Sequence, residues 1–178
     1  MTTQAIQATS ASGASVEALQ NLQLNEFLTF TLGAEEYGVD ILRVQEIRGW
    51  SPVTRIPQSP QHVLGVLNLR GSIVPIIDLR LRFGLERAAV TPLTVIVVLS
   101  VEHASGRREF GLVVDSVSDV LDLDASALRE APALGGHAGS EFIQGLATVA
   151  EKMLILLNVE DLLKRDLDAG ADALAGAA

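Results

Sequence analysis

The stretch GVLNLRGSIVPIIDLR, residues 65–80, decides the fold class of this chain. Two apolar runs flank a mainly polar break at residues 68–72, which contains a glycine. Apolar runs of this length around a glycine-containing turn are typical of a β-hairpin. Asp78 then predicts the start of a short helix, because its carboxylate can accept hydrogen bonds from the free N–H groups of a first helical turn.

The same pattern occurs twice in the chain. Moving the hairpin segment forward by 80 positions, without a gap, places Gly65 on Gly145 and keeps the apolar positions in register. An earlier segment, residues 37–47, matches residues 110–120 at an offset of 73 positions. The two offsets differ by seven residues, and the glycine-rich stretch 135–139 would hold that extra length. Two gapless matches in the same order predict two similarly built halves.

The composition is that of a folded protein without disulfide bonds. The 178 residues are 48% hydrophobic, enough to bury a core in one domain or in two small lobes. Because the chain contains no cysteine, disulfides, thiolate zinc sites and thiol nucleophiles are excluded. A net charge of −9 matches neither nucleic acid nor an anionic membrane surface. The chain has neither a run of 18 apolar residues nor a signal-peptide pattern, so we expect a cytoplasmic protein that does not insert into a membrane.

The two ends of the chain differ in composition from its centre. Residues 1–24 are mostly small and polar, which predicts a flexible tail. Residues 166–178 are rich in Ala, Gly and Asp, and both a frayed helix and a loose tail are compatible with them. We expect residues 25–165 to be mainly antiparallel β, closed as two small barrels with halves at about 27–83 and 93–163, because closure removes exposed strand edges.

Periodicity and turn signals predict the individual elements. Residues 41–47 indicate a short amphipathic helix, and residues 159–165 indicate a closing helix. The β-branched run at residues 93–101 must be buried on both faces. The predicted strands are 27–32, 36–39, 66–69, 73–77, 93–101, 110–114, 142–149 and 153–157.

The sequence contains no recognisable pattern of catalytic or metal-binding residues. His62, His103 and His137 have no further ligand at metal-binding spacing, as is typical of surface or loop histidines. Ser59 lies near His62, but a turn serine is the simpler interpretation, since no nucleophile elbow surrounds it. Four carboxylates lack the glycine and the terminal glutamate of a calcium loop and are interpreted as solvated loop residues: Asp115, Asp119, Asp122 and Asp124. We therefore predict no metal, no cofactor and no enzymatic activity.

Three segments strongly resemble the CheW-like family, which comprises the bacterial chemotaxis coupling proteins and the regulatory domain of the CheA histidine kinase. They are residues 44–80, which include VQEIRGW and the hairpin quoted above, FGLVVDSVSDVL at 110–121 and ILLNVEDLL at 155–163. The resemblance covers about 27–163 and implies two SH3-like five-stranded β-barrels around a shared hydrophobic core, with short helices. Asn158 departs from the family pattern, in which an aspartate is usual at this place.

The resemblance implies a chemotaxis adaptor. One surface would bind the regulatory domain of a CheA-type histidine kinase, barrel against barrel. The groove between the barrels would accept the helical cytoplasmic tip of a chemoreceptor, as an amphipathic helix in an apolar groove. The protein would be monomeric when free and would be recruited to membrane-associated receptor arrays. Two alternatives remain: a coupling module of a chemotaxis-like pathway with another output, such as surface motility, and, more remotely, an enzyme with an unrecognised groove site.

Ten residues are candidates for these surfaces. The positions that match the family's receptor groove are Leu28, Val39, Leu42, Val44, Glu46 and Val117. For Leu28, Val39 and Val117, a role in the core is the alternative. The positions that would shape the hairpin are Gly65, Asn68, Arg70 and Gly71, although the two glycines could serve backbone geometry alone. Because a charge in an apolar strand pair needs a partner, we expect Arg70 to pair with Glu46 at one edge of the groove.

Overall fold

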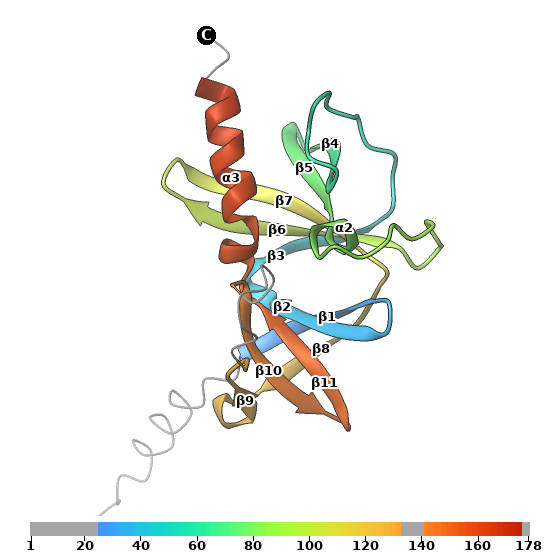
Figure 1. Ribbon diagram of the computed structural model, residues 1–178, viewed down its shortest axis with the longest axis vertical. Helices are drawn as coiled ribbons and strands as arrows, with labels where there is room; N and C mark the ends of the chain where they lie inside the picture. Colours follow the sequence, from blue (N-terminus) through green and yellow to red (C-terminus); the bar gives the residue numbers. More distant parts are fainter. Residues whose placement is uncertain (1–24, 133–140, 176–178) are drawn as a thin grey trace, which may run out of the picture.

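The computed structural model describes residues 25–132 and 141–175, with side chains through Asp168. The predictions for residues 1–24, for the stretch 135–139 and for His137 lie outside these residues. Figure 1 shows two β-sheets, one above the other, with a long helix beside the upper sheet and a short helix near their junction. The mainly β architecture, with two small SH3-like barrels, is as predicted.

Within the described residues, sheet A has the strand order β8-β1-β2-β11-β10-β9 and sheet B the order β3-β6-β7-β5-β4. The strands of sheet A are β1 (Asn25–Leu32), β2 (Glu35–Asp40), β8 (Ser116–Leu123), β9 (Leu128–Arg129), β10 (Ile143–Val149) and β11 (Lys152–Leu157). The strands of sheet B are β3 (Val44–Gly49), β4 (Val63–Leu69), β5 (Ser72–Asp78), β6 (Val95–His103) and β7 (Gly106–Val114). The helical elements are η1 (Ile41–Arg43), α2 (Leu79–Arg82), η2 (Ala125–Ala127) and α3 (Val159–Ala175).

Each sheet combines strands from both halves of the chain. Sheet A contains β1 and β2 from the first half with β8 to β11 from the second, and sheet B contains β3 to β5 with β6 and β7. This differs from the expectation that each half forms its own barrel. After β2 and again after β7 the chain crosses to the other sheet, because β3 pairs with β6 and β8 pairs with β1. Most pairs are antiparallel, and the parallel pairs β2–β11 and β5–β7 join the hairpins.

The sequence repeat recurs in the strand pairing, residue by residue. Gly38 faces Leu156 in the β2–β11 pair, and Gly111 faces Ile76 in the β5–β7 pair. A Cβ on Gly38 would lie 2.8 Å from the Leu156 side chain, and a Cβ on Gly111 would lie 2.5 Å from the Ile76 side chain. The strand order β8-β1-β2-β11-β10 also corresponds to β3-β6-β7-β5-β4 under the two offsets. The two sheets are therefore built in the same way.

A shared hydrophobic core lies between the two sheets. Its largest cluster joins residues of both sheets and α3, such as Leu28, Leu99 and Leu163. Each barrel also has a smaller cluster of its own, around Phe27 in sheet A and around Ile96 in sheet B. Strand β6 is buried continuously from residue 96 to residue 101, as predicted for most of the run 93–101. Leu93, the first residue of that run, lies before the strand and is 68% exposed. Burial of each such large side chain contributes roughly 1.5–3 kcal/mol to folding.

The predicted helix over residues 41–47 is wrong. Only η1 is helical, and the Asp40 side chain caps it by accepting a hydrogen bond from the Leu42 N–H at 2.9 Å. The next residues form β3, whose side chains alternate between half-buried and exposed. The β-branched residues Val44 and Ile47 suit this extended conformation, which β6 stabilises by antiparallel pairing. The equivalent segment after β7 forms the strand β8, which the sequence-based list of strands lacks.

Both predicted helices after the hairpins are present. The Asp78 Oδ1 atom caps α2 by accepting hydrogen bonds from the N–H groups of Arg80 and Leu81, at 3.0 and 3.3 Å. At the start of α3, the Asn158 side chain accepts the Asp161 N–H at 3.2 Å, so asparagine keeps this capping function. Helix α3 continues beyond the predicted end to residue 175. For residues 166–175 this favours a helix over a loose tail.

Candidate partner-binding surface

Val44 and Val117 occupy equivalent positions, where the chain has just crossed from one sheet to the other. They are separated by the offset of 73 and lie at the starts of β3 and β8. Both side chains are half-buried and pack against the shared core. Leu42, in η1 before β3, is 83% exposed. These three residues place exposed or half-buried apolar side chains at the crossovers.

Leu28 and Val39 are core residues. They face each other across the β1–β2 pair, and they are 2% and 0% exposed. Their side chains are therefore not available for direct contact with a partner in this structure. Of the two interpretations of Leu28 and Val39, the role in the core is the one that the structure supports. They support the surface from beneath, because they belong to the same cluster against which Val44 and Val117 pack.

Glu46 and Arg70 form the expected ion pair. The Arg70 Nη2 atom donates to Glu46 Oε2, and the second carboxylate oxygen lies 3.5 Å from Arg48 Nη1. Glu46 lies on β3, not at the end of a helix. The Arg70 side chain is 77% exposed, so the pair contributes only about 0–1 kcal/mol to stability. Among the described residues the Arg70 side chain donates only to Glu46, although a guanidinium has five donors in a planar arrangement.

The hairpin turn after β4 has two successive residues with positive φ. Arg70 and Gly71 have φ values of 53° and 85°, and the Gly71 N–H donates to Asn68 Oδ1 at 3.0 Å. This backbone conformation matches the right-handed twist of the flanking strands. The equivalent turn between β10 and β11 repeats it with Ala150 and Glu151, at 48° and 66°. The turn holds Arg70 at the tip of the hairpin.

Gly65 is required by close backbone packing. A Cβ at this position would lie 2.2 Å from the carbonyl oxygen of Thr54. Thr54 and Val66 exchange two backbone hydrogen bonds, at 2.9 and 3.0 Å, which hold the long segment before β4 against the sheet. Gly65 therefore acts through backbone geometry.

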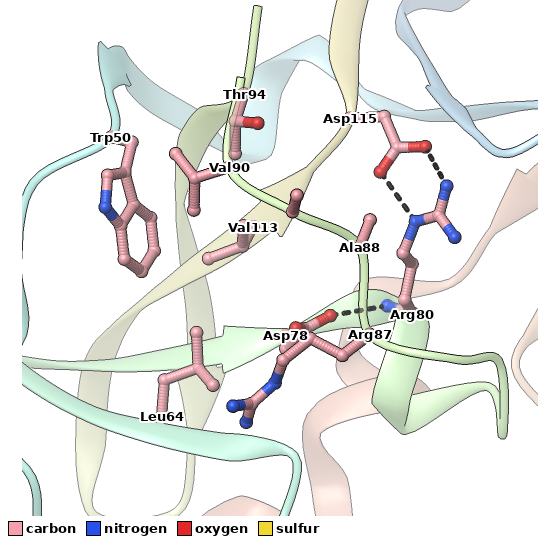
Figure 2. Close-up of a pocket in the computed structure, with 11 residues that line it drawn as sticks. Trp50, Leu64, Asp78, Arg80, Arg87, Ala88, Val90, Thr94, Val113 and Asp115 are labelled. Atoms are coloured by element: carbon pink, nitrogen blue, oxygen red, sulfur yellow. Dashed lines mark hydrogen bonds and ion pairs between the residues drawn. The ribbon is translucent and has the colours of Figure 1, made fainter. Parts of the chain in front are cut away.

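Arg80 and Asp115 form a second, more buried polar contact, which sequence reasoning missed. The distances from Arg80 Nε to Asp115 Oδ1 and from Arg80 Nη2 to Asp115 Oδ2 are 2.7 and 2.5 Å (Figure 2). The Gly33 N–H also donates to Asp115 Oδ2, at 2.8 Å. The hydrogen bond from Arg80 holds the pKa of Asp115 below its usual value and raises the pKa of Arg80. The interpretation of Asp115 as a solvated loop carboxylate is wrong, because its side chain is only 27% exposed and both of its oxygens accept hydrogen bonds from the protein. The available signal was the sequence repeat, because Asp115 lies between β7 and β8, which correspond to β2 and β3 at the offset of 73.

A cavity of about 150 Å³ lies beside this pair, with Trp50, Leu64 and Thr94 in its lining (Figure 2). The carboxylates at its edge are engaged already, Asp78 as the cap of α2 and Asp115 in its ion pair. The lining contains no serine, cysteine, histidine or lysine. The one hydroxyl group in the lining, on Thr94, accepts a hydrogen bond from the Thr91 N–H at 2.9 Å. The cavity therefore shows no Ser–His or Cys–His pair of the kind used in covalent catalysis.

The other polar candidates have structural partners. The His62 Nε2 atom lies 2.7 Å from Asp166 Oδ1 on α3, and the Ser59 hydroxyl donates to the Ile56 carbonyl at 2.9 Å, as expected of a turn serine. Among the residues that the structure describes, no group of three His, Asp or Glu side chains could hold a metal ion. No helix in the described part of the chain is long and apolar enough to cross a membrane.

Two exposed apolar residues follow the two hairpin turns, and sequence reasoning missed both. Ile73 on β5 and Met153 on β11 are 64% and 56% exposed, and the offset of 80 relates them. Ile73 also lines a hollow of about 670 Å³, together with Ile56, Arg107 and Leu167 of α3. The repeat was the available signal, because it aligns the two apolar positions directly after the turns.

Known proteins that resemble this chain over most of its length include several chemotaxis proteins. The profile of the CheW-like domain matches residues 26–167. The chain is 49% identical to Chemotaxis protein CheW of Klebsiella aerogenes over 150 residues, which are 84% of this chain and 88% of that protein. It is 39% identical over 137 residues to the probable chemotaxis protein CheW of Rhizobium etli, 77% of this chain and 86% of that protein. Its fold is similar to the crystal structure of the scaffolding protein TtCheW from Thermoanaerobacter tengcongensis, with a TM-score of 0.70, 31% identity and coverage of 79% and 88% of the two chains.

Proposed function

The chain belongs to the CheW-like domain family, and on this premise we propose that it is the adaptor that couples chemoreceptor tips to a CheA-type histidine kinase. One observation carries this proposal: the 49% identity to a chemotaxis protein CheW extends over 84% of the chain. An adaptor needs binding surfaces and no catalytic group, and the lining of the cavity beside Arg80 contains no serine, cysteine, histidine or lysine. Recruitment to receptor arrays would follow from these protein contacts.

The receptor surface in this proposal is formed by Leu42, Val44 and Val117 at the two crossovers. An amphipathic receptor helix would bury its apolar face against these residues. The Glu46–Arg70 pair lies two residues farther along β3 from Val44. Its charges would favour one orientation of the receptor helix, since rim charges act mainly on specificity and association rate.

The kinase surface in this proposal is the exposed apolar face around Ile73. The regulatory domain of the kinase resembles this chain, so a contact of barrel against barrel would join two related surfaces. Ile73 supplies exposed apolar area, and Arg107 and Arg108 line the same hollow. Apolar residues with arginine at their border are typical of the centre of a protein interface.

Co-sedimentation with receptor-containing membranes tests the proposal. We expect the protein to pellet with the receptors and to bring a CheA-type kinase into the pellet. The variant Val117→Glu should lose receptor binding and keep kinase binding, because it places a charge in the apolar receptor surface. Val120→Glu is the matched control, since Val120 lies on the same strand, is 45% exposed and is outside the proposed surface.

Thermal unfolding of both variants shows whether each remains folded. Loss of folding in Val117→Glu alone would instead assign Val117 to the core, because a buried unpaired charge is strongly destabilising. Failure of the unmodified protein to pellet with either partner would overturn the adaptor function itself.

A further inference from the structure

Both crossovers between the sheets are joined to a helix by an ion pair. At the first crossover, Arg43 is the residue before β3, and its Nη2 atom lies 2.5 Å from Glu160 Oε1 on α3. At the second, Asp115 is the residue before β8 and pairs with Arg80 on α2. Each helix follows a hairpin of the sheet that the chain leaves at that crossover, β10–β11 for α3 and β4–β5 for α2.

The two ion pairs occupy equivalent places with reversed charge. Arg80 and Glu160 are related by the offset of 80, and each is the second residue of its helix. Arg43 and Asp115 agree with the offset of 73 to within one residue. The helix therefore carries the base in one pair and the acid in the other. The fold accepts either arrangement of charge at this place.

We propose that Arg43–Glu160 and Arg80–Asp115 are positioning pairs, which set the angle between the two barrels and, through it, the shape of the receptor surface. Each pair links a helix attached to one sheet with the residue at which the chain enters the other sheet. Val44 directly follows Arg43, and Val117 is two residues after Asp115. A shift of either crossover therefore moves the apolar residues of the receptor surface. The effect on that surface rests on the proposed function, whereas the effect on the barrel angle does not.

The two positioning pairs are held with different strength. The Arg80 and Asp115 side chains are 22% and 27% exposed, and the backbone of Asp115 also donates to the Thr31 carbonyl on β1 at 3.1 Å. The Arg43 and Glu160 side chains are 36% and 45% exposed and share a single contact. Since exposure to water weakens an ion pair, we expect the Arg80–Asp115 pair to have the larger effect on barrel geometry.

Electron paramagnetic resonance on a doubly spin-labelled protein measures the barrel angle without any partner. The chain has no cysteine, so Ala104→Cys, in the turn between β6 and β7 of sheet B, and Lys152→Cys in sheet A introduce two unique labelling sites, both exposed. The reversal Asp115→Arg should shift or broaden the distance distribution between the labels, because two arginines then repel each other. The double reversal Arg80→Glu with Asp115→Arg copies the charge arrangement of the other pair and should shift the distribution back toward the original one. The return is partial, because an arginine at position 115 cannot accept the Gly33 N–H.

Two further variants make the result decisive. Glu141→Arg breaks an exposed pair, with Arg165 at 3.9 Å, outside the crossovers, and should leave the distribution unchanged. Asp115→Asn keeps the side-chain shape, and it replaces Asp115→Arg in the experiment if the Asp115→Arg protein does not fold. An unchanged distribution in a folded Asp115 variant, or no restoration in a folded double reversal, would overturn the proposal.

Receptor binding by the same variants separates the two parts of the inference. We expect a loss of affinity of roughly fivefold or more in the single variant and recovery in the double reversal. If the distances change and recover while receptor affinity stays constant, the barrel-angle role stands and the link to the receptor surface is wrong. If the unmodified protein binds no receptor at all, the proposed function fails, while the distance measurement still tests the positioning role.

Discussion

Replacing Gly65 with alanine should destabilise the protein by roughly 2–4 kcal/mol. The new Cβ would lie 2.2 Å from the Thr54 oxygen and 2.7 Å from its carbonyl carbon, and backbone atoms cannot rotate away. The φ angle of 152° at this position is one that L side chains rarely adopt, and such strain costs roughly 1–3 kcal/mol. Relief of the clash would separate Thr54 from Val66 and break two hydrogen bonds, each worth about 0.5–1.5 kcal/mol.

The repeat supplies a matched control in Gly145, which occupies the equivalent place in sheet A. There the new Cβ would lie 3.0 Å from the Arg129 oxygen, a contact that a shift of a few tenths of an ångström relieves. The φ angle of Gly145 is not among the strained positive values. Since loss of glycine flexibility in the unfolded chain also offsets part of the cost, Gly145→Ala should cost less than about 1 kcal/mol.

Urea unfolding followed by the fluorescence of Trp50, the single tryptophan, measures both variants. Trp50 lies four residues before Thr54, so its signal reports on the affected segment. The free energies of unfolding should differ by well over 1 kcal/mol between the variants. Values within about 0.5 kcal/mol of each other would refute the close-packing argument. Loss of partner binding by a fully stable Gly65→Ala protein would instead assign Gly65 to an interface.

Three further predictions concern the charged and apolar surfaces. Arg70→Lys and Glu46→Gln should each impair kinase activation in receptor membranes, and the double variant should lose less activation than the sum of the two single losses. Fully additive losses would show that the residues do not act as a pair. Ile73→Glu should weaken binding of the isolated kinase regulatory domain, measured by calorimetry, while Met153→Glu at the equivalent place should not; equal losses would contradict the choice of the Ile73 face. The lowered pKa of Asp115 means that its ion pair stabilises the folded state above the unfolded value, about 3.9, and that this contribution is lost as the pH falls through the lower folded value. The stability difference between the unmodified protein and Asp115→Asn should therefore shrink in acid urea titrations, and a difference that is constant with pH would exclude this linkage.

Local pattern predicted the elements whose signal lies within a few residues. The hairpin at 65–80, the cap at Asp78 and the buried strand β6 were all predicted, because turn residues and apolar runs specify them directly. The short segment 41–47 was assigned to a helix because its polar residues fit a helical period as well as an alternating one. Its pairing with β6, a contact between distant parts of the chain, makes it a strand.

One of the two ion pairs was predictable from the sequence, and the other was not. Glu46 and Arg70 were paired from the sequence because an isolated charge beside apolar strands needs a partner. Asp115 and Arg80 were not paired, because their contact depends on how the chain crosses between the sheets. Leu28 was placed in the groove by resemblance to the family, whereas its burial follows from its position in the core cluster between the two sheets.

The exchange of strands between the halves affects how the chain can fold. The Thr29 hydroxyl donates to the Asp119 carbonyl, 90 positions farther along the chain, so β1 gains its second neighbour only after most of the chain has been synthesised. Such non-local pairing slows folding, since the loop must close before the contacts stabilise it. A cut between α2 and β6 would leave two fragments that each lack strands of both sheets. We expect such fragments to recover structure only when mixed, because the chain contains two copies of one pattern but a single cooperative folding unit.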